Sequence, residues 1–117
     1  MYKYGKRTGV KGGARFKSGM TSCARCGSGA LLQEHHVVYV QHLRQEGGDV
    51  TDSANALTLC ADCHRKHHDR AHPVPLALLR DENYRFAAAL YGPKSYDYLR
   101  RRYSGEDPRL DALLETA

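Results

Sequence analysis

Histidines are frequent in this chain and gather in two short segments. Of the seven histidines in 117 residues, five are His35, His36, His64, His67 and His68. If residues 64–68 are helical, His64 and His68 lie one turn apart on one face, where two imidazoles can bind one metal ion. His35 and His36 are neighbours in a predicted strand, so their side chains should point to opposite sides of it. The spacing therefore predicts a metal site, with His67 outside the His64 and His68 pair.

Four cysteines form two Cys-x-x-Cys turns, Cys23-x2-Cys26 and Cys60-x2-Cys63. Two such turns can place four thiolates around one tetrahedral ion, and zinc suits four sulfurs best. A disulfide or redox pair is the alternative, but the flanking residues do not show the βαβ pattern of a thioredoxin motif. We therefore predict a structural zinc site that supplies folding energy and no catalysis, so a catalytic ion is expected at the histidines.

The elements predicted around these residues follow a β, β, α order. Residues 31–40 favour a strand, residues 47–53 a loop, and residues 57–59 a second strand that pairs antiparallel with the first. The second Cys-x-x-Cys turn opens a helix. Beyond residue 72, apolar residues from Leu76 to Leu90 predict a helix that ends near Gly92, Pro93 starts another, and Asp107-Pro108 can open a short last one.

Taken together, the motifs resemble those of a known nuclease family. They occur in the order Cys23-x2-Cys26, Glu34-His35-His36-Val37-Val38, Gly47-Gly48, Asn55 and Leu57-x-Leu59-Cys60-x2-Cys63-His64-x3-His68. This order, over residues 23–69, resembles the HNH (ββα-metal, His-Me finger) endonucleases, in particular the zinc-containing subgroup with four cysteines. The resemblance implies an α+β fold with a small, treble-clef-like ββα-metal core at residues 21–72. We expect a flexible basic arm at residues 1–20 and a helical extension packed on the core at residues 73–117, as one domain overall.

The resemblance also implies the role of each site residue. It makes His36 the general base and Asn55 the residue that orients the base and ties the loop. It assigns a catalytic divalent ion to His35, His64 and His68. Mg²⁺ or Mn²⁺ is the expected ion, although imidazoles also suit Ni²⁺ and Zn²⁺.

The chemistry of phosphodiester hydrolysis agrees with these roles. The reaction needs a nucleophile made from water and a cation near the charge that develops on the phosphate and the leaving oxygen. A neutral imidazole can take a proton from water at neutral pH, provided that a partner fixes its tautomer. The backbone of the Asn55 loop is the expected partner of His36.

The charge of the chain favours a nucleic-acid partner. The net charge is +5 and the pI about 9.1, and residues 1–19 carry six basic residues, Arg15 and Lys17 among them, with no acidic one. Arg44 lies in an expected polar loop over residues 39–46, and Arg65 and Lys66 lie on the exposed side of the predicted metal helix. The candidate DNA contacts are Arg15, Lys17, Arg44, Arg65 and Lys66. A solubilising tail and a solvated helix face would predict the same residues.

The remaining histidines and the C-terminal aromatic residues have structural interpretations. His42, His67 and His72 have no role in the motif and are expected to face solvent. Residues 96–103 interleave tyrosines with three arginines, Arg100, Arg101 and Arg102. At helical spacing the tyrosines are expected to pack on the core rather than stack on bases, while the arginines are candidates for DNA contacts.

These expectations lead to a metal-dependent DNA endonuclease or nickase with low sequence specificity. The arm, the core and residues 98–103 together resemble small stand-alone HNH proteins of bacteriophages, which implies a phage DNA-packaging terminase as a partner. The alternative is a non-catalytic, zinc-stabilised module that binds DNA or protein, with incidental histidines. No apolar stretch reaches the roughly 18 residues of a membrane span. We therefore expect a monomer in the cytoplasm, that of the bacterial host if the chain is phage-encoded.

Overall fold

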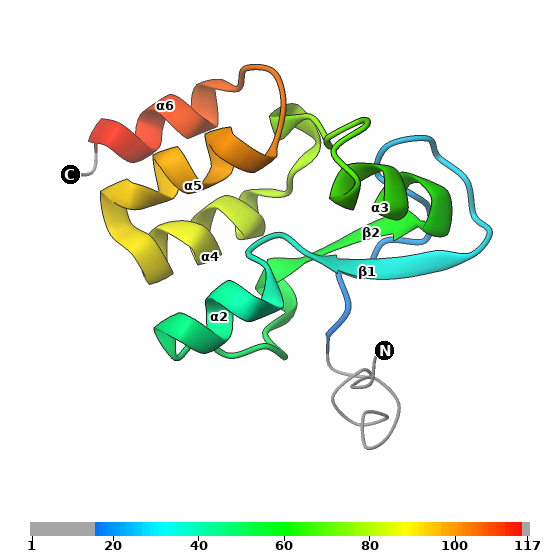
Figure 1. Ribbon diagram of the computed structural model, residues 1–117, viewed down its shortest axis with the longest axis horizontal. Helices are drawn as coiled ribbons and strands as arrows, with labels where there is room; N and C mark the ends of the chain where they lie inside the picture. The colour runs from blue at the N-terminus through cyan, green and yellow to red at the C-terminus, as the bar shows by residue number, and fades with distance from the viewer. Residues whose placement is uncertain (1–15, 116–117) are drawn as a thin grey trace.

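The structure is a computed structural model that describes residues 16–115 (Figure 1). Most of the predicted basic arm, Arg15 included, lies outside the described residues. In chain order the elements are β1 (Leu32–His36), α2 (Val40–Glu46), the 3-10 turn η1 (Ser53–Asn55), β2 (Ala56–Cys60), α3 (Ala61–His68), η2 (Leu76–Leu78), α4 (Asp81–Tyr91), η3 (Gly92–Lys94), α5 (Ser95–Arg102) and α6 (Pro108–Glu115). This α+β arrangement, with two strands and a helix at its centre, confirms the predicted fold class.

The two strands pair antiparallel, as predicted, and α3 follows β2 directly. Leu32 lies opposite Cys60, and His36 lies opposite Ala56. Every residue of β2 is buried. The thiol of Cys60 accepts a hydrogen bond from the backbone N–H of Cys63 and so caps the start of α3. The second Cys-x-x-Cys turn therefore joins strand to helix without an intervening loop.

Strand β1 ends four residues earlier than the predicted strand, which extended to Val40. The backbone N–H of Val37 donates to the carbonyl of Asn55 (2.9 Å). The Asn55 side chain then accepts from the N–H of Val38 (2.8 Å) and donates to its carbonyl (2.9 Å). An asparagine side chain thus takes the place of the next strand partner, and the chain turns away from the sheet.

The polar loop predicted over residues 39–46 is wrong, because this segment forms helix α2. The helix ends at Gly47, whose φ of 73° is the left-handed conformation that glycine adopts readily at a helix C-terminus. Leu43 is its one buried residue. A helix of two turns with a single apolar anchor shows no hydrophobic periodicity, which explains why the sequence pattern missed it.

The helical extension also departs in detail from its prediction. The helix expected from Leu76 to Gly92 is divided into η2 and α4, because Leu79 and Arg80 are extended between them. The backbone N–H of Arg80 is capped by the side chain of Asn83 (2.8 Å). Helices α4, α5 and α6 lie side by side at one end of the molecule, away from α3 (Figure 1). No helix within residues 16–115 is long and apolar enough to cross a membrane.

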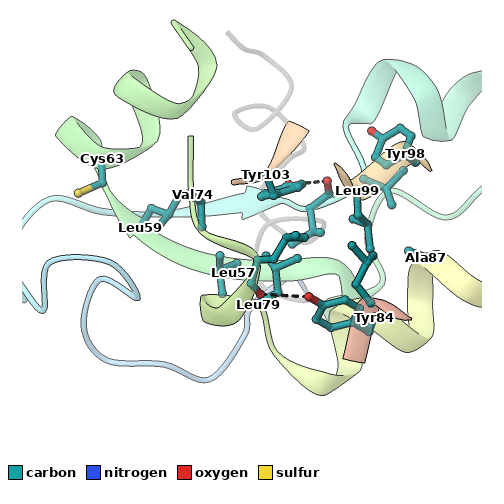
Figure 2. Close-up of a cluster of buried hydrophobic side chains, with 14 of the residues drawn as sticks. Leu57, Leu59, Cys63, Val74, Leu79, Tyr84, Ala87, Tyr98, Leu99 and Tyr103 are labelled. Atoms are coloured by element: carbon teal, nitrogen blue, oxygen red, sulfur yellow. Dashed lines mark hydrogen bonds between the residues drawn. The ribbon is translucent and has the colours of Figure 1, made fainter. Parts of the chain in front are cut away.

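A continuous apolar cluster joins the extension to the sheet (Figure 2). Leu57 of β2 and Leu99 of α5 are fully buried in it, and Tyr84 and Tyr103 are nearly so. Burial of apolar surface of this kind is the main source of folding energy in a small domain. The sheet and the extension therefore share one core.

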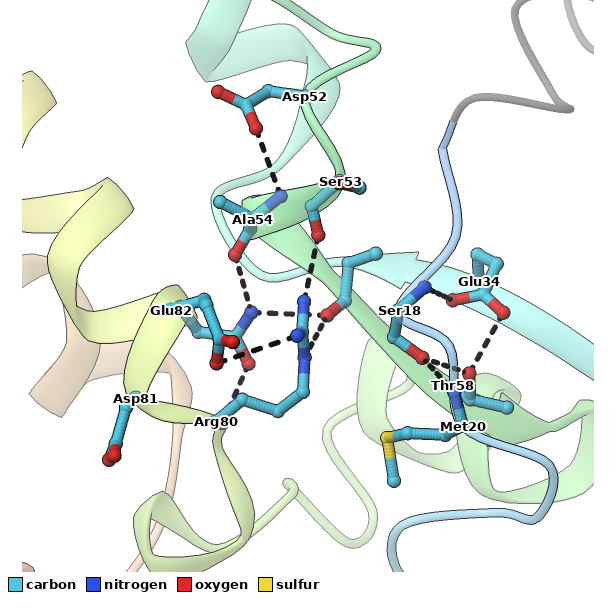
Figure 3. A network of polar contacts seen from close by, with 12 residues as sticks. Ser18, Met20, Glu34, Asp52, Ser53, Ala54, Thr58, Arg80, Asp81 and Glu82 are labelled. Atoms are coloured by element: carbon cyan, nitrogen blue, oxygen red, sulfur yellow. Dashed lines mark hydrogen bonds and ion pairs between the residues drawn. The ribbon is translucent and has the colours of Figure 1, made fainter.

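Polar contacts fix the turn that precedes β2 (Figure 3). The guanidinium of Arg80 donates to the carbonyls of Ser53 (2.7 Å) and Ala56 (3.0 Å). The amide of Asn83 donates to the carbonyl of Ala54 (2.8 Å). The start of α4 therefore clamps the turn that carries Asn55.

The segment before the first cysteine turn is tied to the outer face of the sheet (Figure 3). The Thr58 hydroxyl donates to the Glu34 carboxylate (2.8 Å) and lies 2.6 Å from the Ser18 hydroxyl. The backbone N–H of Ser18 also donates to Glu34 (3.2 Å). These contacts place the neighbouring Phe16 beside the end of β1.

Candidate active site and metal centres

The four cysteine sulfurs converge where Leu32 pairs with Cys60. Cys23 and Cys26 come from the turn before β1, and Cys60 and Cys63 from the junction of β2 and α3. The four sulfurs all lie within 4.8 Å of one another. This donor set fits a four-coordinate ion, so the group can hold a metal and is consistent with structural zinc.

Backbone amides prepare these sulfurs for a cation. The N–H groups of Arg25 and Cys26 point at the sulfur of Cys23, at 3.4 and 3.5 Å. Burial raises the pKa of the Cys23 thiol, but hydrogen bonds from backbone N–H groups outweigh it and lower the pKa to about 6. Burial and the neighbouring thiols raise the pKa of Cys63 to about 12. Four adjacent thiols therefore ionise together only with a cation among them.

A second group of possible ligands forms where α3 crosses β1. The ring of His35 lies 5.1 Å from that of His64 and 5.2 Å from that of His68, between centroids. The rings of His64 and His68 are 4.9 Å apart, as expected for residues one helical turn apart. One nitrogen from each of the three lies within 4.8 Å of the others. The structure thus brings together the three histidines predicted as ligands of one ion.

Hydrogen bonds determine which nitrogen His35 presents to this group. The Tyr103 hydroxyl donates its proton to the carbonyl of Val37 (2.6 Å). It can therefore only accept from Nε2 of His35, which lies 2.8 Å away. His35 is fully buried, and its Nδ1 has no hydrogen-bond partner among the described residues. A buried nitrogen with a lone pair and no partner is what a metal ligand would look like before the ion is added.

A hydrogen bond to β1 also orients His64. Nδ1 of His64 lies 2.8 Å from the side-chain oxygen of Gln33, so Nδ1 carries the proton and Nε2 the lone pair. His68 is exposed at the mouth of the site.

The three histidines of this possible metal site, His35, His64 and His68, are called the ligand histidines below, and all three are held in the neutral form that a metal would require. Burial and the neighbouring imidazoles lower the pKa of His35 well below its ordinary value and lower that of His64 to about 4. Burial lowers the pKa of His68 as well. Neutral imidazoles keep their lone pairs for a cation, so the residues present fit a divalent ion.

His36 lies beside this group and has a different environment. Its ring stacks on Phe16, with centroids 3.8 Å apart and planes 10° apart. Nε2 of His36 lies 3.0 Å from the carbonyl oxygen of Val50, which can only accept, so Nε2 carries the proton and Nδ1 the lone pair. Burial lowers the pKa of His36, although the hydrogen bond to Val50 opposes this effect. At neutral pH His36 is therefore an uncharged imidazole with a fixed tautomer.

A cavity of about 530 Å³, the metal-site cavity, connects His36 to His64 and His68. Its lining residues come from β1, α2 and α3 and from the segment between β1 and α2. They are Gln33, Glu34, His36, Tyr39, Val40, Gln41, His64 and His68. A ligand in this cavity can contact the base predicted from the motif and the two helical histidines at once.

Asn55 is buried and acts on the backbone next to His36. Its side chain holds both polar groups of Val38, and its carbonyl accepts from Val37. Nε2 of His36 donates to the carbonyl of Val50, in the same loop. Asn55 therefore holds the backbone beside His36, and its side chain is engaged by Val38.

The predicted DNA contacts that the structure describes lie on the surface, and Arg65 lines a further cavity together with His64 and His68. Arg44 and Lys17 are exposed. Arg65 pairs with Asp62 (2.7 Å), and so does Lys66 (3.1 Å). Exposed helix pairs of this kind are weak, so they leave these cations able to approach a phosphate.

Two histidines expected to face solvent have structural roles instead. His67 is 2% exposed. Its Nδ1 accepts from the N–H of Val74 (2.9 Å), and its Nε2 lies 2.8 Å from the Tyr39 hydroxyl. His42 is half-buried against the hydroxyl of Tyr98 (2.6 Å). The expectation of exposure is therefore wrong for His67 and for His42. It is confirmed for His72, which is exposed.

Several residues of the site carried no recognisable signal. Tyr103 is separated by 68 residues from His35, and Val50 acts through its backbone, which any residue type could supply. Gln33 and Tyr39 flank the motif in the sequence. Their polar side chains, next to the motif, were the one feature from which a role in the site could have been predicted.

One comparison with known proteins gave a match. The family model described as HNH endonuclease matches residues 23–70. This segment is less than half of the chain, yet it contains the four cysteines, the ligand histidines, His36 and Asn55. Searches of curated proteins and of solved structures gave no significant match.

Proposed function

We propose that the protein is a metal-dependent endonuclease or nickase that hydrolyses phosphodiester bonds in DNA, because the HNH endonuclease family model matches residues 23–70. The domain supports a nuclease-type enzyme in general and implies DNA as its substrate. The finer assignment rests on the residues of the metal-site cavity.

One observation carries the proposal. His35 belongs to the same group of possible ligands as His64 and His68, and its buried Nδ1 lacks a hydrogen-bond partner among the described residues. A buried polar atom without a partner lowers the free energy of unfolding by about 1–3 kcal/mol. A cost of that kind at a motif position favours a ligand role. In a non-catalytic zinc module the cysteines alone would suffice, so this alternative is not favoured.

His36 is the group we assign to proton transfer. With Nε2 donating to Val50, Nδ1 can take the proton of a water molecule that attacks the phosphorus atom. The Phe16 ring and the hydrogen bond hold the imidazole in place, and its lowered pKa keeps it unprotonated at neutral pH. Asn55 fixes the loop that supplies the Val50 carbonyl.

The three ligand histidines are assigned to a divalent ion. Bound there, such an ion would polarise the phosphate and offset the charge on the leaving oxygen. We propose Mg²⁺ or Mn²⁺ as the ion, with Ni²⁺ and Zn²⁺ also suited to imidazoles. His35 and His64 contribute ligand atoms whose tautomers are already set, and His68 completes the group at the solvent side.

Low sequence specificity is part of the proposal. The cations near the site are arginines and lysines on short surface segments, which suit backbone phosphates, and phosphate contacts carry no sequence information directly. A packaging terminase as partner stays a prediction from the sequence resemblance.

A plasmid-nicking assay tests the proposal. Purified protein would be supplied with Mg²⁺, Mn²⁺ or Ni²⁺, and wild type would be compared with His36→Ala and with His72→Ala, an exposed histidine that lines no described cavity. Loss of a general base should slow cleavage by about 10²–10⁴-fold, while His72→Ala should cut like wild type. A wild type that is inactive with every ion, or a His36→Ala variant that cuts as well as wild type, would refute the proposed endonuclease activity.

A further inference from the structure

A smaller cavity is lined by His68 together with residues of the helical extension. Its volume is about 160 Å³, and we call it the basic pocket. Its lining residues are Tyr39, His67, His68, Arg70, Pro73, Arg101 and Arg102. The basic pocket shares Tyr39 and His68 with the metal-site cavity. A molecule bound in it would therefore lie next to the ligand histidines.

The basic pocket is positively charged and lacks a neutralising group. Three arginines and no acidic residue line it. Within residues 16–115, Arg70 and Arg101 have no ion-pair partner, whereas Arg65, Arg80, Arg100 and Arg109 each pair with a carboxylate. Two unpaired guanidinium groups at one small cavity favour an anion, and guanidinium geometry matches phosphate.

The third arginine of the basic pocket is held in a fixed position. The guanidinium of Arg102 donates to the carbonyl of Tyr98 (3.0 Å) and lies 3.9 Å from the centre of the Tyr98 ring. It also lies 5.7 Å from the centre of the Tyr39 ring. A cation fixed in this way loses little conformational freedom when an anion binds.

The hydroxyl of Tyr39 adds a neutral donor. His67 Nδ1 accepts from the N–H of Val74, so the proton of His67 is on Nε2 and is donated to the oxygen of Tyr39. The Tyr39 hydroxyl proton is therefore left to be donated, and no acceptor for it exists among residues 16–115. Burial raises the pKa of Tyr39, although Arg102 and Arg70 oppose this effect, so the hydroxyl keeps its proton at neutral pH.

The backbone conformation of Arg70 is unusual for a residue with a side chain. Its φ is 63°, in the left-handed region just after α3. Glycine is the usual residue at this position of a helix end, and any other residue is strained there. Backbone strain of this kind is concentrated at functional sites, so it favours a use for the Arg70 guanidinium.

From these observations we propose that the basic pocket binds a backbone phosphate of the DNA strand, adjacent to the phosphate that is hydrolysed beside the ligand histidines. Ligand pockets for larger molecules usually measure about 300–1,000 Å³, so a pocket of about 160 Å³ suits one phosphate group and excludes a whole nucleotide. The cleavage of the neighbouring phosphate rests on the proposed function, whereas the binding of a DNA phosphate does not.

The proposal gives the helical extension a part in substrate binding. Arg101 and Arg102 belong to α5, outside the segment that the family model matches, whereas His68 and Arg70 belong to α3 or follow it. The basic pocket therefore exists only because the extension packs against the end of the metal helix.

DNA binding without cleavage tests the proposal. A fluorescein-labelled DNA duplex would be titrated with protein in the absence of added divalent ion, and its anisotropy measured at several salt concentrations. The Arg70→Gln/Arg101→Gln double variant should bind about tenfold more weakly. Its slope of log affinity against log salt should fall by about one, because one phosphate contact is lost. The Arg70→Lys/Arg101→Lys variant keeps the charge and should recover most of the slope.

The matched control is Arg85→Gln/Lys94→Gln, which removes the same charge from exposed residues that line no described cavity. It should keep the wild-type slope. Equal slopes for the basic-pocket variant and this control would overturn the proposal. Because no cleavage is measured, a wild type that fails to nick plasmid would refute the proposed function and leave the result for the basic pocket intact.

Discussion

The hydroxyl of Tyr103 lies 2.8 Å from Nε2 of His35, although 68 residues separate the two in the sequence. Tyr103 follows the last residue of α5, in the extension, and His35 lies one residue before the end of β1. Because the same hydroxyl donates to the carbonyl of Val37, it sets the His35 tautomer and leaves Nδ1 with a lone pair and no hydrogen-bond partner among the described residues. The extension therefore orients a histidine of the segment that the family model matches.

Tyr103→Phe should weaken binding of the catalytic ion while the protein stays folded. Without the hydroxyl, His35 can carry its proton on Nδ1, and binding must first move it to Nε2. Loss of a residue that orients a metal ligand typically reduces metal affinity by about 10–100-fold. Isothermal titration of the zinc-loaded protein with Ni²⁺ or Mn²⁺ would measure the change.

Tyr84→Phe is the control for this experiment. The Tyr84 hydroxyl is also buried and donates to the carbonyl of Leu76 (3.1 Å), which still accepts from the backbone N–H of Leu79 (3.1 Å) when the hydroxyl is removed. Tyr103→Phe should lose about 1–3 kcal/mol of unfolding free energy and Tyr84→Phe about 0.5–1.5 kcal/mol, and only Tyr103→Phe should lose metal affinity. Equal metal affinities in the two variants would show that the tautomer of His35 is not set by Tyr103.

Substitutions in the cysteine group should impair folding, whereas substitutions in the histidine group should impair activity alone. Cys60→Ser removes a ligand at the junction of β2 and α3, and structural zinc contributes folding energy comparable to the whole stability of a small domain. This variant should lose zinc and unfold. His68→Ala changes an exposed side chain and should stay folded, keep its zinc and lose nicking activity.

Zinc content by mass spectrometry and helix content by circular dichroism would distinguish the two outcomes. A Cys60→Ser protein that is folded and free of zinc contradicts this division of roles. So does a His68→Ala protein that retains full activity.

Asn55→Ala should reduce stability and activity together. The substitution leaves the N–H and carbonyl of buried Val38 without partners, a loss of about 2–4 kcal/mol in unfolding free energy. It also loosens the loop that holds the Val50 carbonyl against His36. Urea unfolding and plasmid nicking would be measured on the same preparations.

His36→Ala is the comparison for Asn55→Ala. It should lower activity strongly with a smaller change in unfolding free energy, because it removes a half-buried ring and leaves the sheet intact. If Asn55→Ala unfolds at the wild-type urea concentration, its side chain does not support the loop and the positioning role is wrong.

The parts of the site that were predictable are those set by local spacing. Cys60, Cys63, His64 and His68 lie within nine consecutive residues, where a helix fixes the relative placement of side chains. The antiparallel pairing of residues 32–36 with 56–60 follows from two apolar segments joined by a glycine-containing loop. Spacing along one element translates directly into distance.

The parts that were missed depend on contacts between distant segments. Helix α2 has one buried residue, Leu43, and so leaves no periodic pattern. The pairing of Tyr103 with His35 follows from how α5 packs on the sheet, and tyrosines at helical spacing predict only that they are buried. The basic pocket also depends on the packing of α5, which brings Arg101 to the same cavity as Arg70.

Arg70 gives a final prediction, in which two substitutions differ in stability and weaken DNA binding equally. Its φ of 63° costs a residue with a side chain roughly 1 kcal/mol that glycine avoids. Part of the gain from glycine is offset by the greater freedom of the unfolded chain. Arg70→Gly should therefore be about 0.5 kcal/mol more stable than Arg70→Ala, which keeps the strain. Both variants lack the guanidinium and should show the same weakened DNA binding. Thermal unfolding and duplex anisotropy would be measured on both. If Arg70→Gly is no more stable than Arg70→Ala, the left-handed backbone at residue 70 is not strained. The backbone conformation then gives no support to the basic pocket.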